Sequence, residues 1–166
     1  DPSVELRRDA VQRVIDEAAA LKEADNKPAA TKTYQNALNA ARDIDQIKTS
    51  TAALRQLGET VDLPRHFGFL MHWNVIGPFD NTKRKGFGAV YPPENKINFS
   101  ASYDGKSGKV KWSEFVTADE YGMVNINKAY PGSGDGLKEV TAFAHTEYQA
   151  TEARDVELRL GCKNGW

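Results

Sequence analysis

The chain has 166 residues, of which 40% are hydrophobic and 27% charged, a composition ordinary for a globular protein able to bury a core. Its net charge is -1 and its pI about 6.4, whereas phosphate binding needs clustered, uncompensated Lys and Arg, so no nucleic-acid partner is expected. No apolar run approaches the roughly 20 residues that span a bilayer, so no transmembrane segment is expected either.

Residues 1–60 are predicted to be helical. Asp1-Pro2-Ser3 is typical of a helix start, a second helix is expected from Pro28, and a third over 45–57 with Gly58 as its left-handed C-terminal residue. Small and apolar residues recur at helical spacing throughout this region. Those expected to face the core are Val4, Val11, Ile15, Ala18, Leu21, Ala30, Tyr34, Ala37, Leu38, Ala41, Ile47, Ala53, Leu54 and Leu57.

This helical region resembles two kinds of repeat. Residues 1–11 resemble the opening helix of a HEAT-type repeat, and residues 19–41, with Tyr34 and Leu38, are similar to a tetratricopeptide helix pair. The repeat resemblance implies that Asp1 is the cut end of a longer solenoid whose neighbours cover the exposed helix faces. The alternative is a local helical hairpin or three-helix packing element.

A linker over residues 61–68 leads into the first predicted strand, residues 69–76. Side chains alternate between the two faces of a strand, which gives this one an apolar face and a mixed face. The apolar face carries Phe69, Met71, Trp73 and Val75, and the mixed face carries Leu70, His72, Asn74 and Ile76. Gly77-Pro78 is expected to end the strand, because proline has no N–H to donate.

The remainder alternates short apolar segments with turn sequences. Residues 90–94 are expected to be extended, and the strands are expected over 98–103, 110–115, 121–126, 140–148 and 153–160, with a hairpin turn at 104–108 and an irregular loop at 130–136. Short strands separated by turns are typical of an antiparallel sandwich. The predicted fold is therefore α+β, with the helical segment (1–60), the linker (61–68) and a jelly-roll-like β-sandwich (69–166).

An ordered series of motifs in the β-rich part carries a family resemblance. The series is Trp73-Asn74-Val75-Ile76-Gly77-Pro78-Phe79, Tyr91-Pro92-Pro93-Glu94, Tyr103-Asp104-Gly105-Lys106, Val110-Lys111-Trp112 and Val156-Glu157-Leu158-Arg159-Leu160-Gly161. It resembles a jelly-roll module of large bacterial extracytoplasmic proteins, of the planctomycete type, often found downstream of helical repeats. In that family an acidic turn and further strands follow, whereas residues 162–166 here read CKNGW. The resemblance thus implies a module truncated at its C-terminus, with an open sheet edge that needs a partner.

The candidate binding residues lie in loops. Tyr91 and Tyr130, each beside a proline, are the aromatic rings expected to be exposed for stacking on a sugar, and Asp80, Asn81 and Asp135 are loop oxygens that could hold Ca²⁺. Trp73 and Trp112 are expected to pack in the core instead.

Signals for catalysis or a resident metal are weak. His66, His72 and His145 lack metal-ligand spacing and are interpreted as locally hydrogen-bonded side chains, with zinc or copper as the alternative. Scattered carboxylates such as Glu94, Asp104, Glu114, Asp119 and Glu120 could pair as an acid and a base, but nothing in the sequence sets their separation.

The sequence therefore predicts a non-catalytic binding or assembly module, with carbohydrate as the expected ligand and an extracytoplasmic location. The alternative is an interaction subunit whose helices and open sheet edge pack against other protein chains. No resident cofactor is expected beyond a loop-bound Ca²⁺. The single cysteine, Cys162, is interpreted as a small buried residue, and it excludes an internal disulfide.

Overall fold

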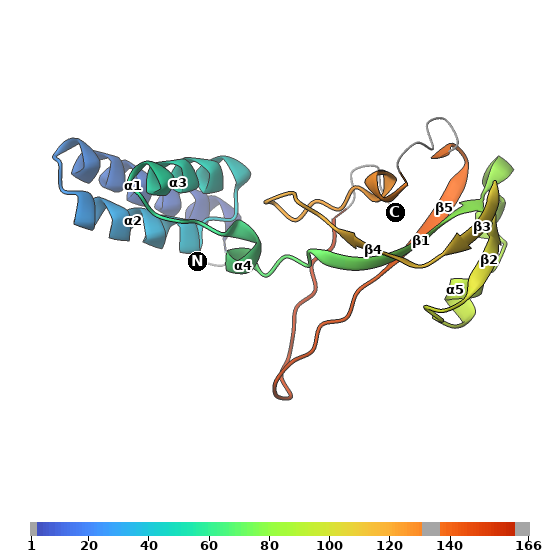
Figure 1. Cartoon of the computed structure of the whole chain (residues 1–166). Coiled ribbons are helices and arrows are strands. Elements are labelled where there is room, and N and C mark those ends of the chain that lie inside the picture. Colours follow the sequence, from blue (N-terminus) through green and yellow to red (C-terminus); the bar gives the residue numbers. More distant parts are fainter. Residues whose placement is uncertain (1–2, 131–136, 162–166) are drawn as a thin grey trace. The chain divides into compact units, whose positions relative to one another are not determined.

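The structure, a computed structural model, describes residues 3–130 and 137–161. The chain divides into two compact units, Asp1–His66 and Phe67–Trp166 (Figure 1). The predicted helix start at Asp1-Pro2, the candidate ligand Asp135 and the terminal CKNGW segment that includes Cys162 lie outside the described residues.

Three helices packed side by side make up most of the first unit (Figure 1). They are α1 (Val4–Glu23), α2 (Lys27–Ala40) and α3 (Ile44–Gln56), and the short α4 (Leu63–Phe67) follows. The helix boundaries follow local capping signals. Ser3 Oγ accepts from Leu6 N, Asn26 Oδ1 accepts from Ala29 N, and Gly58 has the predicted left-handed φ of +93° after α3.

The segment predicted as a linker contains α4, which sequence reasoning missed. Pro64 is compatible with this helix because it lies in the first turn, where a backbone N–H would have no helical partner. Asp62 Oδ1 accepts a hydrogen bond from Arg65 N at 3.1 Å and supplies the start of this turn.

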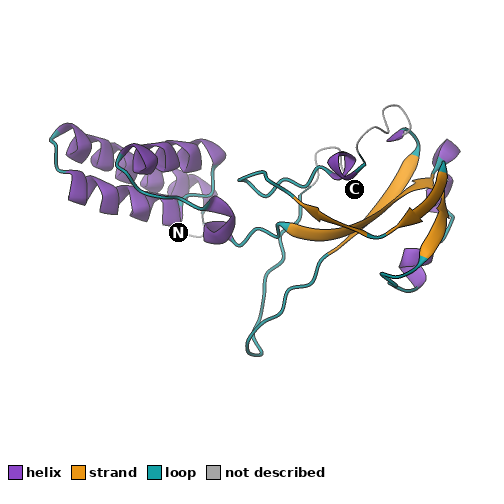
Figure 2. Ribbon diagram, viewed as in Figure 1, coloured by secondary structure: helices purple, strands orange, loops and turns teal. Residues whose placement is uncertain are grey.

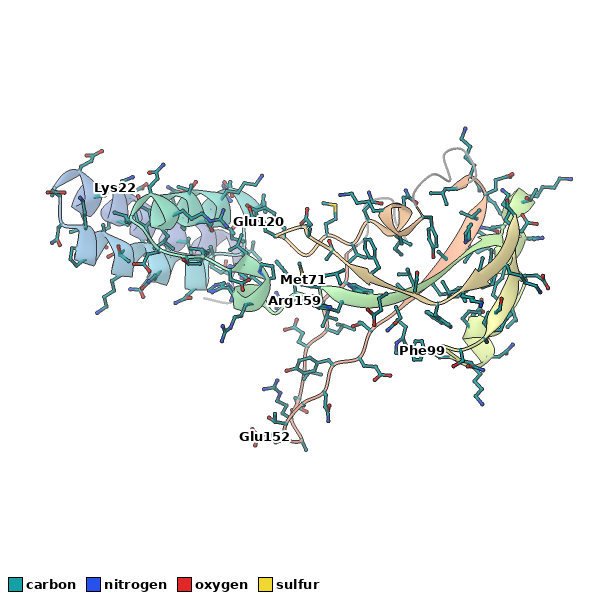
Figure 3. All side chains as sticks on the ribbon, viewed as in Figure 1. Lys22, Met71, Phe99, Glu120, Glu152 and Arg159 are labelled. Atoms are coloured by element: carbon teal, nitrogen blue, oxygen red, sulfur yellow. The ribbon has the colours of Figure 1, made fainter. Side chains whose placement is uncertain are left out.

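The helices meet through small side chains. Ala18, Ala30, Ala37 and Ala41 are completely buried, so the backbones approach closely. Polar contacts tie α1 to α3, because Gln46 Nε2 donates to the carbonyl of Arg8 at 2.9 Å and the Arg8 guanidinium pairs with Asp45 at 2.5 Å. Lys22, labelled in Figure 3, donates to Gln56 Oε1 and links the other ends of the same two helices.

The described part of the second unit contains a three-stranded and a two-stranded antiparallel sheet (Figure 2). The first has the order β4–β1–β5, and the second is the hairpin β2–β3. The strands are β1 (His72–Asp80), β2 (Ser102–Gly105), β3 (Gly108–Lys111), β4 (Ser113–Val116) and β5 (Val140–His145). The predicted hairpin turn joins β2 to β3. Helices followed by antiparallel strands confirm the α+β class.

The strand β1 does not end at Gly77-Pro78 as predicted. Instead the register slips by one residue there, since Ile76 pairs with Phe143 but Phe79 pairs with Thr141. A bulge accommodates a proline without a ladder hydrogen bond, and Gly77 adopts a φ of +153°. The slip leaves Ile76 and Phe79 on the same face, although a regular strand would put residues three apart on opposite faces.

Aromatic packing on that face forms the core of the second unit. Phe79, Tyr91 and Phe143 have ring centroids 5.3–5.8 Å apart, and Ile76 and Val110 complete the cluster with Tyr103 and Trp112 at its margin. The hairpin β2–β3 is fixed against the bulge, because Lys106 N donates to the Pro78 carbonyl at 2.9 Å. A Cβ on Gly105 would lie 2.8 Å from that same carbonyl oxygen, so glycine allows the close approach.

Further predictions differ from the structure. Val4, expected to face the core, is 60% exposed, and the strand expected over 110–115 is divided between β3 and β4, which belong to different sheets. Residues 92–95 form the helical turn α5 (Pro92–Asn95), not an extended segment, because Glu94 Oε1 accepts from Tyr91 N and two prolines suit the first turn. The strand expected over 98–103 begins only at Ser102, and residues 121–126 contain no strand. Two 3₁₀ segments, Thr82–Phe87 and Ile126–Ala129, occupy loops.

Another difference concerns residues 153–160, which alternate as predicted but form no strand. Val156, Leu158 and Leu160 are 65%, 66% and 63% exposed. This extended ribbon follows a bend whose tip carries Glu152, labelled with Arg159 in Figure 3. The reason for the wrong prediction is that alternation supplies a two-faced ribbon, but a strand also needs a neighbouring backbone, which no described segment provides.

Candidate functional site

Tyr91, the first predicted sugar-stacking residue, lies in the core. Its side chain is 9% exposed, its ring contacts Phe79 and Phe143, and its hydroxyl donates to the Asp80 carbonyl at 2.7 Å. The expectation of an exposed ring was wrong because α5 turns the chain back onto the sheet at this residue. A buried ring cannot offer its face to a sugar.

Asp80 and Asn81 stabilise the turn that follows β1. The Asp80 carboxylate accepts from Lys85 Nζ at 2.5 Å and from Thr82 N at 3.0 Å, and these interactions hold the pKa of Asp80 well below its usual range. Asn81 Oδ1 accepts from Gly86 N at 2.7 Å. The side-chain oxygens proposed for Ca²⁺ therefore serve the loop itself.

Tyr130 is half-buried. Its hydroxyl is enclosed without a hydrogen-bond partner among residues 3–130 and 137–161, and burial raises the pKa of Tyr130 to about 12. Its partly covered ring is less available than the sequence suggested. The described residues of the two predicted loops therefore present no pair of exposed aromatic rings.

A different set of side chains converges on one face of the sheet β4–β1–β5. The strand register places Glu114, Asn74 and His145 in a row across the three strands, since Asn74 pairs with both neighbours. Side chains directly opposite one another in antiparallel strands lie about 5 Å apart at Cβ. A polar row across about 10 Å of sheet follows from this register and from the strand spacing.

A second row lies beside the first. His72 pairs with Val116 on β4, and the Thr146 hydroxyl donates to the His72 carbonyl at 2.9 Å just beyond the end of β5. Glu147 is two residues after His145 and lies 3.6 Å from its Nε2. Two carboxylates, Glu114 and Glu147, therefore stand near opposite ends of this polar surface.

Aromatic rings form the wall of this surface. Phe99, on the loop before β2 (Figure 3), meets the rings of Trp112 and His145 edge-on, with centroids 5.4 and 5.3 Å away. Trp73 also belongs to the lining, but alternation along β1 puts its side chain on the face opposite to Asn74, and its Nε1 donates to the Leu70 carbonyl at 2.8 Å. Trp112 Nε1 is enclosed without a hydrogen-bond partner in the described ranges.

Together these residues line a concave site of about 330 Å³, here called the sheet groove. Its lining residues are His72, Trp73, Asn74, Phe99, Glu114, Val116, His145, Thr146 and Glu147. The groove exists because the hairpin β2–β3 and its loop cover only the Ile76–Phe143 half of this face. The other half, with the polar rows, stays uncovered.

The sheet groove combines aromatic edges with donors and acceptors. Asn74 offers two donors and a carbonyl, Glu114 two acceptor oxygens, and His145 Nδ1 is enclosed without a partner among the described residues. Within those residues no three His, Cys, Asp or Glu side chains are grouped to hold a metal ion. The arrangement suits reversible binding of a small polar molecule with some apolar surface.

The sequence did not predict this site as a group, although several of its residues had been identified individually. His72 and Asn74 were assigned correctly to the mixed face of the first strand, and that mixture was the available signal. The partners come from β4, from β5 and from the loop before β2. Register across three strands cannot be deduced from spacing along the chain.

Comparison with known proteins leaves the chain without a match: no family model, no curated protein and no solved structure is similar to it. None of the described helices combines the length and the apolar character needed to cross a membrane.

Proposed function

We propose that this chain is a non-catalytic carbohydrate-binding module of a bacterial extracytoplasmic protein, and that the sheet groove holds the sugar. In this proposal the two sheets are parts of a jelly-roll-like β-sandwich, as the family resemblance implies, and the helices act as a spacer. The single observation that carries the proposal is the row Glu114–Asn74–His145 beneath an aromatic wall.

The chemistry of a sugar matches such a surface. A pyranose ring has an apolar face of C–H groups, which packs on aromatic side chains, and a rim of hydroxyls that need both donors and acceptors. Phe99 and His145 offer aromatic surface, while Asn74 and Glu114 offer hydrogen bonds of both kinds. Phe99 is 47% exposed and so remains available for contact.

Binding of soluble neutral polysaccharides, measured by affinity electrophoresis and calorimetry, tests the proposal. Asn74→Ala and Phe99→Ala are each expected to weaken binding about 5- to 30-fold, because each removes one hydrogen-bonding or ring contact worth about 1–2 kcal/mol. The matched control is Phe87→Ala, since Phe87 is 92% exposed and lies outside the groove. Binding that survives both groove variants but is lost in Tyr130→Ala would place the ligand at the loops instead.

A second candidate function is assembly with other protein chains, favoured by the ribbon 153–160. Its three exposed aliphatic side chains alternate with Asp155, Glu157 and Arg159, as in a strand with one face to bury. Such a ribbon can add to the edge of a partner's sheet.

Sedimentation of the full chain across a hundredfold range of concentration tests this candidate. Leu158→Lys is expected to shift any association to higher concentration, because it removes apolar contact area from the ribbon. The matched control is Glu152→Lys, because Glu152 lies at the tip of the bend that precedes the ribbon. A chain that stays monomeric and binds no partner in its native extract would exclude assembly through the ribbon.

A further inference from the structure

We infer that the sheet groove selects its ligand by charge, accepting uncharged sugars and rejecting those that carry carboxylate or sulfate groups. The inference deepens the proposed function and rests on it. Its basis is the composition of the lining, in which two of the nine described residues are carboxylates and none of those nine is Lys or Arg. Protein sites for anionic ligands ordinarily use Arg or Lys.

The two carboxylates lack strong compensation. Glu114 forms no ion pair with any described residue, and its position opposite Asn74 puts it at the β4 end of the polar row. Glu147 approaches His145 Nε2 at 3.6 Å, which is a charged pair only when the imidazole is protonated. No Lys or Arg among the described lining residues therefore offsets the charge of the two carboxylates.

The placement of these charges makes the selection independent of how the sugar lies. Glu114 belongs to β4 on one side of β1, whereas His145 and Glu147 belong to β5 and the residues just after it on the other side. A ligand across the three strands must therefore approach one carboxylate or the other. A hydroxyl can donate to that oxygen, but an anionic group can neither donate to it nor escape the repulsion.

Matched pairs of oligosaccharides at pH 8 and low salt test the inference. The probes are cellohexaose with its C6-carboxylated counterpart, and a galactose hexamer with oligogalacturonate. The neutral member of a pair is expected to bind about 3- to 30-fold more tightly than the acidic member, since each exposed charge contact changes affinity by a few-fold. The ratio is expected to shrink in 0.5 M NaCl, because salt screens charges at this separation.

Variants assign the effect to the groove. Glu114→Gln and Glu147→Gln keep the shape and the carbonyl acceptor but remove the charge, so each is expected to lower the ratio of neutral to acidic affinity about 2- to 5-fold. Glu152→Gln, on the bend outside the groove, is the matched control and should leave the ratio unchanged.

The possible outcomes distinguish failure of the charge selection from failure of the proposed sugar-binding function. Equal or tighter binding of the acidic members, or a ratio that the two groove variants do not alter, would overturn the charge selection while leaving a sugar-binding role standing. No binding of any of the four probes, nor of the neutral polysaccharides, would overturn the proposed function and the selection together.

Discussion

The two units of this chain are stabilised in contrasting ways. In the helical unit, small residues such as Ala18 and Ala37 let helices approach closely, and α1 and α2 each begin at a capping side chain that immediately precedes the helix. In the β unit, a few large aromatic side chains fill the core, and its strands depend on neighbours up to about seventy residues away in the chain. The comparison teaches that local signals suffice for one unit, whereas the other depends on long-range register.

The largest expected effect comes from removing one aromatic ring from the core of the β unit. Phe79 is 1% exposed, so Phe79→Ala should lower the free energy of unfolding of the β unit by about 3–5 kcal/mol. Near-ultraviolet circular dichroism should report this loss in urea titrations, while the helical signal in the far ultraviolet keeps its own midpoint. Phe87→Ala, at an exposed ring, is the control. A common shift of both signals would show that the units do not differ in the way described.

A smaller loss is expected from adding one methyl group at the bulge. A Cβ at position 77 would lie 2.9 Å from the Ala142 Cβ, and Gly77 has a φ of +153° that side chains disfavour. Gly77→Ala should therefore cost about 2–4 kcal/mol in the same titration. Gly88→Ala serves as the control, because no atom lies within 4 Å of its added Cβ. Equal effects of the two changes would contradict the close packing of β1 against β5.

Overpacking probes the helical unit in the same way. Ala37 is fully buried between helices, so Ala37→Leu should destabilise this unit by about 1–3 kcal/mol, whereas Ala20→Leu on an exposed face should change it by less than about 0.5 kcal/mol. Far-ultraviolet melting curves measure both. A tolerated leucine at position 37 would mean that the helices are less closely packed than the alanines indicate.

The smallest expected effect is on the stability of the helical unit at acidic pH. The Arg8 guanidinium lowers the pKa of Asp45 from 3.8 to about 2, so the folded state holds fewer protons than the unfolded one in this range. The resulting stabilisation is complete above about pH 4 and is lost as the pH falls toward 2. Asp45→Asn should therefore reduce the decline of helix stability between pH 5 and 2. An unchanged decline, or one insensitive to 1 M NaCl, would contradict a role for this exposed pair.

The sequence was sufficient wherever structure depends on nearby residues. The three long helices begin and end close to their predicted limits because Ser3, Asn26 and Gly58 act within their own turns. The hairpin β2–β3 was predicted for the same reason. The jelly-roll-like arrangement remains a prediction.

Failures of the sequence predictions come from long-range contacts. From the sequence, Tyr91 is predicted to be an exposed loop residue, but the turn α5 places it in the core. In the ribbon 153–160, apolar and charged side chains alternate as in a strand, but no described segment pairs with its backbone. Predicting the sheet groove would have required the strand register, which places Asn74 between Glu114 and His145. Such register depends on how strands from distant parts of the chain meet.

The one-residue slip in β1 has a consequence for how this chain can vary. The polar row and the aromatic anchor Phe79 share a face only because an extra residue separates Asn74 from Phe79 and restores the parity of the strand. Insertions or deletions between them should therefore be tolerated in even numbers only. A single added or lost residue would move either Asn74, in the groove, or Phe79, in the core, to the opposite face of the sheet.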